Sequence, residues 1–133
     1  METSRLAAIP LFSGLSESDL AAIAAAASEV EAAEGETLVS EGDFGHALYA
    51  IESGSAEVSA NGTKLNTLGP GDVFGEMAVV AAGRRMASVV ATSPMRLIAL
   101  FKPGVWALEK QAPEVAGRLR ALIADRRAAN AGL

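Results

Sequence analysis

The sequence lacks several features on which enzymes and extracellular proteins often depend. It contains no cysteine and one histidine, His46, among 133 residues. The lack of cysteine excludes disulfides, thiol nucleophiles and thiolate metal sites, and it favours the cytoplasm. A single histidine supplies neither the ligand cluster of a metal-dependent cupin-type enzyme nor a nucleophilic triad. We therefore expect no catalysis, no metal and no cofactor, and we predict that His46 is an ordinary loop residue.

Aromatic residues and long apolar runs are also scarce. Only 5% of the residues are aromatic although half are hydrophobic, which predicts an aliphatic core. The longest nearly apolar stretch, residues 20–27, is far shorter than the roughly 20 residues of a membrane-spanning helix, so we expect neither a membrane segment nor a signal peptide. The length is that of one domain, predicted over residues 1–133.

The sequence has fewer positive than negative residues: 11 Lys and Arg against 16 Asp and Glu, which gives a net charge of −5. This balance argues against a protein that grips a phosphate backbone, and no helix-turn-helix pattern follows the last predicted helix. We therefore expect no nucleic acid partner. Any small anionic ligand must be met by a local concentration of positive charge.

Turn signals divide the chain into helical ends and a strand-rich middle. Residues 1–29 are predicted to be largely helical, because Ser16-Glu17-Ser18-Asp19 is a capping signature directly before the apolar run of residues 20–27. Over residues 30–101, short apolar runs alternate with turns, which is typical of antiparallel strands in a sandwich or barrel.

The sharpest turn signal is Asn61-Gly62, because a two-residue type I′ turn requires positive φ at both positions. It predicts a hairpin that joins a strand over residues 56–59 to a strand over residues 63–68. Residues 96–101 form a further predicted strand, and Pro103-Gly104 is predicted to end the sheet region.

Helical spacing returns near the C-terminus. Residues 105–111 predict a short helix, and Pro113 suits the first position of a second helix. The second helix carries an apolar stripe of Val115, Leu119, Leu122 and Ile123. The arginines beside this stripe are predicted to form a solvated face: Arg118, Arg120, Arg126 and Arg127.

One stretch, residues 74–83, interrupts the strand pattern with helix-forming residues after Gly75. A helix that begins there would direct unpaired N–H groups at an anion, and the arginines at 84 and 85 offer a planar fork for phosphate oxygens. Glu76 would repel a phosphate but is a strong acceptor for a sugar hydroxyl. The residues indicate a ligand with one phosphate and one ribose hydroxyl. An ion pair of Glu76 with Arg85 that ties a loop to the sheet is the structural alternative.

The same stretch resembles the phosphate-binding cassette of cyclic nucleotide-binding domains. The motif is Phe-Gly-Glu-Met-Ala at residues 74–78 with an arginine nine residues after the glutamate, and strand and turn motifs at 41–43, 48–51, 54–58 and 68–72 follow in the family's order. The resemblance implies an α+β fold: an antiparallel β-roll (double-stranded β-helix, jelly-roll-like) flanked by an N-terminal helix and two C-terminal helices. The cassette would span residues 74–88, and the C-terminal helices with the lid would span residues 105–129.

The resemblance also implies roles for individual residues. Glu76 corresponds to the acceptor of the ribose 2′-hydroxyl, and Arg85, rather than Arg84, to the arginine that grips the cyclic phosphate. Val58 and Val73 take positions that often give the purine an apolar wall. Backbone N–H groups would approach the ligand at Gly75, Met77, Ala78 and Met86.

The last helix is similar to that of a bacterial cyclic nucleotide-gated potassium channel, in which an arginine at the position of Arg126 lies over the purine as part of a lid. Family members that favour guanine commonly have threonine where this chain has Met86, so we expect cAMP to be preferred over cGMP. The implied function is a cytoplasmic sensor, whose C-terminal helix closes on the ligand and whose effector protein the sequence does not identify. A ligand-free interaction scaffold, or an excised domain of a channel or regulator, is the alternative.

Overall fold

Short helices precede the first strand, and the longest of them begins at the predicted cap. In the computed structural model, which describes residues 1–43, 45–75, 85, 87–118 and 121, the Ser16 hydroxyl accepts a hydrogen bond from the Asp19 N–H. α1 spans Thr3–Ala7, the 3₁₀ turn η1 spans Pro10–Phe12, and α2 spans Glu17–Ala26. Strand pairing begins at residue 27 rather than at residue 30, because Ala27 already pairs with Leu100.

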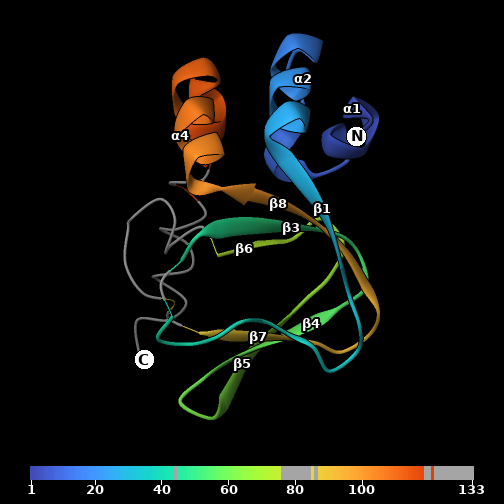
Figure 1. The fold of residues 1–133 in the computed structure, drawn as a ribbon, viewed down its shortest axis with the longest axis vertical. Helices are drawn as coiled ribbons and strands as arrows, with labels where there is room; N and C mark the ends of the chain where they lie inside the picture. Colours follow the sequence, from blue (N-terminus) through green and yellow to red (C-terminus); the bar gives the residue numbers. More distant parts are fainter. Residues whose placement is uncertain (44, 76–84, 86, 119–120, 122–133) are drawn as a thin grey trace.

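The eight described strands form two four-stranded antiparallel sheets, with the orders β1-β8-β3-β6 and β2-β7-β4-β5. The labelled helices lie on one side of the first sheet and the second sheet lies on the other (Figure 1). The predicted antiparallel roll is thereby confirmed. The strands are β1 Ala27–Ala32, β2 Thr37–Val39, β3 Ala47–Ser53, β4 Ala56–Ala60, β5 Thr63–Leu68, β6 Val73–Phe74, β7 Ser88–Ala91 and β8 Met95–Phe101.

The hairpin between β4 and β5 turns where the sequence predicts it. Asn61 has a φ of 52° and Gly62 a φ of 76°, as the positive-φ turn requires. The N–H of Asn61 also donates to the Glu41 carboxylate at 3.1 Å. This bond connects the tip of the hairpin to the turn at residues 41–43.

Successive side chains of a strand point to opposite faces of the sheet, so the first sheet divides the core into two layers. Leu48, Ile98 and Leu100 pack against the helices, whereas Ile51 and Leu97 face the second sheet. Tyr49 and Phe74 stack in this second layer, with ring centroids 5.1 Å apart. As predicted, most of the core is aliphatic.

The helix after β8 begins earlier than predicted. α4 spans Lys102–Gln111, so Pro103 lies in its first turn, where the missing N–H removes no hydrogen bond within the helix. Residues 113–118 are helical again and begin at Pro113 as predicted. No helix in the described part of the chain is long and apolar enough to span a membrane.

Arg118 is not part of a solvated face. Its Nη1 donates to the carbonyl oxygens of Pro10, Leu11 and Ser13, at 3.3, 2.9 and 2.7 Å. The prediction failed because η1 is distant in sequence, and helix periodicity alone does not reveal such a neighbour. The second C-terminal helix is thus attached to the N-terminal helices at its described end.

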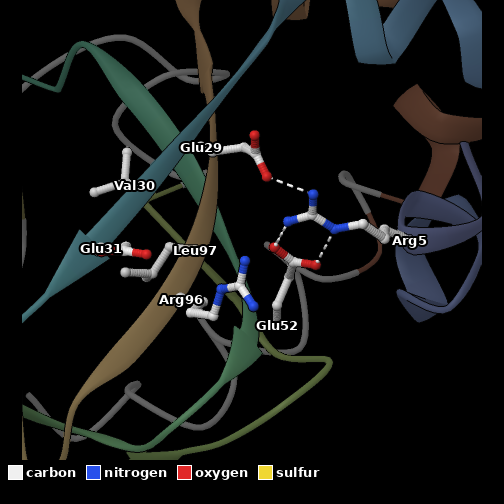
Figure 2. Close-up of a pocket in the computed structure, with 7 residues that line it drawn as sticks. All are labelled: Arg5, Glu29, Val30, Glu31, Glu52, Arg96 and Leu97. Atoms are coloured by element: carbon white, nitrogen blue, oxygen red, sulfur yellow. Dashed lines mark hydrogen bonds and ion pairs between the residues drawn. The ribbon is translucent and has the colours of Figure 1, made fainter. Parts of the chain in front are cut away.

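Arg5 ties α1 to the first sheet through two carboxylates (Figure 2). Its Nε and Nη2 donate to Glu52 at 2.9 and 2.5 Å, and its Nη1 forms an ion pair with Glu29. The hydrogen bonds that Arg5 donates to Glu52 and Glu29 raise the pKa of Arg5, and the bond from Arg5 lowers the pKa of Glu29. The contact stabilises the charged forms of these groups.

Candidate functional site

The guanidinium of Arg85 lies between the end of β6 and the start of β3. Its Nη1 donates to the carbonyl oxygen of Gly75 at 3.0 Å, and its Nη2 donates to that of Ala47 at 2.7 Å. Arg85 is 7% exposed and is the single charged residue among the buried residues of the described chain. The two bonds fix the plane of a buried cation at the edge of the first sheet.

The backbone of Arg85 is held as firmly as its side chain. Its N–H donates to the carbonyl oxygen of Asp43 at 2.5 Å, and its own carbonyl accepts from the N–H of Gly42 at 2.9 Å. The N–H of Glu41 donates to the Ser88 hydroxyl at 2.8 Å. The turn at residues 41–43 therefore holds the chain at Arg85 and again where β7 begins.

Gly75 is required by its conformation and by its neighbours. Its φ of 84° lies in the region that favours glycine, and a Cβ atom there would fall against Arg85 Nη1 and 2.9 Å from the Ala47 carbonyl oxygen. The glycine of the Phe-Gly-Glu motif thus allows the arginine to reach the edge of the sheet.

The structure brings together two of the predicted site residues, Gly75 and Arg85. The predicted helix after Gly75 lies outside the described residues. So do five predicted ligand contacts: Glu76, Met77, Ala78, Met86 and Arg126.

Val58 and Val73 do not share one apolar wall. Val58 is half-buried and packs against the layer between the sheets, whereas Val73 is buried against the helices on the opposite face of the first sheet. The alternation of β6 turns Phe74, not Val73, toward the inter-sheet layer. The two valines therefore lie in different layers of the core, and their contact with a purine stays a prediction.

Ala47 and Asp43 contact Arg85 but are not predicted from the sequence. Both act through backbone carbonyls, so the identity of their side chains carries no signal. The turn motif at residues 41–43 is visible in the sequence, but its contact with Arg85 depends on the tertiary fold. His46 is an exposed loop residue before β3, as predicted.

A hollow of about 410 Å³ lies beside Arg5, and its lining differs in chemistry from the surroundings of Arg85 (Figure 2). The charged side chains that line it are two arginines and three glutamates: Arg5, Arg96, Glu29, Glu31 and Glu52. Because carboxylates outnumber cations there, the hollow is poorly suited to a phosphate. Within the described ranges, no three His, Asp or Glu side chains gather closely enough to hold a metal ion.

Comparison with known proteins agrees with this fold. Residues 29–111 match the family model described as "Cyclic nucleotide-binding domain". That match covers more than half of the sequence, and the chain therefore belongs to the cyclic nucleotide-binding domain family. The resemblance recognised from the cassette is confirmed, while the likeness of its last helix to that of a channel stays a prediction.

Two curated relatives show the extent of the similarity. The "Cyclic AMP receptor protein" of Thermus thermophilus is 39% identical over 98 residues, which cover 70% of this chain and 45% of the relative. The "cAMP-dependent protein kinase regulatory subunit" of Yarrowia lipolytica is 38% identical over 90 residues, covering 68% of this chain and 24% of the relative. The chain thus spans less than half the length of these relatives.

A solved structure shows the same fold. The catabolite activator protein of Thermus thermophilus superimposes with a TM-score of 0.81 at 36% identity, over 92% of this chain and 61% of that one. The two-sheet roll with its flanking helices is thus the family's architecture.

Proposed function

We propose that this chain binds a cyclic nucleotide, prefers cAMP to cGMP, and acts as a sensor without catalysis of its own. The observation that carries the proposal is the buried guanidinium of Arg85, oriented by the carbonyls of Gly75 and Ala47. A guanidinium pre-oriented in this way loses little freedom when it meets a phosphate, and its charge-assisted bonds are strong. We assign the cyclic phosphate to Arg85 and the ribose 2′-hydroxyl to Glu76.

Two observations support cAMP over cGMP. The names of both curated relatives refer to cAMP. In addition, this chain has Met86 after the cassette arginine and so lacks a hydroxyl there that could bond guanine.

We propose that the response to the ligand is a movement of the C-terminal helix, with Arg126 over the purine. Arg118 anchors the described part of that helix to η1 through three carbonyls. Because this part of the helix is fixed, closure on the ligand would involve the residues beyond Arg118. A ligand shifts such an equilibrium only by its differential affinity for the two states, typically about 1–3 kcal/mol.

The output would pass to an effector protein or to a domain attached to this one, as in a larger channel or regulator. We propose the cytoplasm as the compartment, which suits a chain without cysteine. A scaffold that no longer binds nucleotide is the second candidate. The scaffold is disfavoured because it would need neither the motif glycine at residue 75 nor the buried cation of Arg85.

Thermal unfolding with cAMP, cGMP and 5′-AMP tests the proposal. Ligand at about 100 times its Kd adds about 2.7 kcal/mol to stability, which raises the Tm of a domain of this size by roughly 10 °C. We expect the largest shift with cAMP, a smaller one with cGMP, and little with 5′-AMP. The absence of any shift with either cyclic nucleotide at millimolar concentration would exclude the sensor and favour the scaffold.

A further inference from the structure

Phe101, the last residue of β8, breaks the burial pattern of its strand. Met95, Leu97 and Ala99 stand on the same face of the strand and are each at most 2% exposed. Phe101 continues this row but is 46% exposed. The alternation of β8 therefore puts Phe101 at the end of the row that faces the second sheet, with its ring half in solvent.

The pairing of β8 with β3 places this ring beside the site of Arg85. Phe101 is the ladder partner of Ala47, and facing residues of antiparallel strands have Cα atoms about 4.5–5.5 Å apart with side chains on the same face. The carbonyl of Ala47 in turn accepts the bond from Arg85 Nη2. The aromatic ring and the guanidinium therefore flank the same residue.

We propose that Phe101 is a further ligand-contacting residue, whose ring packs against the base of the bound cyclic nucleotide. The proposal rests on the function proposed above, because it takes Arg85 as the phosphate anchor. Every base has an apolar π-face, and stacking on an aromatic side chain is a general way to bind it. Binding would cover an apolar ring that the ligand-free protein leaves half exposed.

The other exposed aromatic side chain in the described part of the chain provides a matched control. Trp106 is 53% exposed and lies on α4, next to Val105, which is fully buried against the helices. Its position on the helix gives it no ladder contact with the Arg85 site. A residue of similar size and exposure can thus be removed without touching the proposed base contact.

The experiment measures the Kd of cAMP by calorimetry for the wild type, Phe101→Ala, Phe101→Leu and Trp106→Ala. We expect Phe101→Ala to weaken binding by about tenfold, from the measured range of base–aromatic stacking. Phe101→Leu keeps most of the apolar volume but loses the aromatic face, so it should fall between Phe101→Ala and the wild type. Trp106→Ala should bind like the wild type.

A fluorescence measurement tests the contact directly. In Trp106→Phe/Phe101→Trp, the introduced indole is the one tryptophan of the chain. Stacking on the purine should quench its emission when cAMP is added, whereas Trp106 in the wild type should change little. This measurement also covers the case in which Phe101→Ala fails to fold.

The outcomes separate the two proposals. If the wild type binds cAMP but the Phe101 variants bind equally well and the new indole is not quenched, the assignment of Phe101 is wrong and the proposed function stands. Equal losses in Phe101→Ala and Trp106→Ala would overturn the assignment as well. If the wild type binds no cyclic nucleotide, the proposed function itself fails.

Discussion

At the scale of single residues, two backbone carbonyls and a glycine determine where the charge of Arg85 lies. The carbonyls of Gly75 and Ala47 orient its guanidinium, and a side chain at residue 75 would occupy the same space. Placing a positive group at a buried position costs free energy unless hydrogen bonds compensate for the lost water. The protein provides part of this compensation from the main chain, so the cation stays in place at the edge of the sheet.

Gly75→Ala should therefore destabilise the fold and weaken ligand binding. We expect a loss of about 1–3 kcal/mol in the free energy of unfolding, because strain at φ 84° adds to the displacement of Arg85. Gly35→Ala is the matched control, since Gly35 has a φ of 87° with nothing within 4 Å of an added Cβ. Chemical denaturation and cAMP titration compare the two. Equal stability losses with unchanged cAMP affinity would show that the contact with Arg85 is unimportant.

The ion pairs of Arg5 predict a modest dependence of stability on pH. The bond from Arg5 holds the pKa of Glu29 below its ordinary value of 4.5, so this contribution to stability is complete above that value and is lost as the pH falls through the lowered pKa. In urea denaturation, the wild type should exceed Glu29→Gln in stability at neutral pH, and the gap should shrink as the pH falls below 4.5. The effect is small because the Glu29 side chain is half exposed. A gap that stays constant down to pH 3 would contradict this account.

At the scale of secondary structure elements, the sequence correctly predicted the caps and turns that depend only on residues close together in the chain. The Ser16 cap and the Asn61-Gly62 turn occur as predicted, because a hydroxyl at an N-cap and positive φ in a tight turn are local requirements. α4 begins earlier than predicted because Pro103, an end signal for the sheet, is equally acceptable in a first helical turn.

The sequence alone did not predict contacts between elements that are far apart in the chain. Arg118 is one of several arginines near the C-terminus of the sequence, and the sequence pattern does not distinguish the one that meets the carbonyls of η1. Val73 and Phe74 are both apolar, and only the pairing of β6 with β3 determines which of them faces the second sheet. The family motif identified Arg85 and Gly75, but not the carbonyl of Ala47 that completes their arrangement.

The attachment of the C-terminal helix to η1 can be tested with Arg118→Ala. Removal of a charged donor shared by three carbonyls should lower the free energy of unfolding by about 1–2 kcal/mol. Lys110→Ala, at an exposed position of α4, is the control and should change stability little. Denaturation with urea measures both. If Arg118→Ala is as stable as Lys110→Ala, these hydrogen bonds do not hold the helix.

At the scale of the whole molecule, a net charge of −5 coexists with the proposed site for a small anion. The surface charge disfavours polyanions such as nucleic acids, because these need many exposed cations in a row. A single cyclic phosphate needs only one oriented cation and several N–H donors. The fold provides the cation at the edge of one sheet, and the helices and the second sheet cover the two faces of that sheet (Figure 1).

The most direct test of this account is calorimetric titration of cAMP into the wild type, Arg85→Ala and Arg84→Ala. We predict micromolar or tighter binding to the wild type, about −8 kcal/mol or better. Arg85→Ala should lose about 2–4 kcal/mol of binding free energy because it removes charge-assisted bonds to a buried phosphate, while Arg84→Ala should bind nearly as the wild type. Wild-type affinity in Arg85→Ala, or a greater loss in Arg84→Ala, would contradict the assignment of Arg85 as the phosphate ligand.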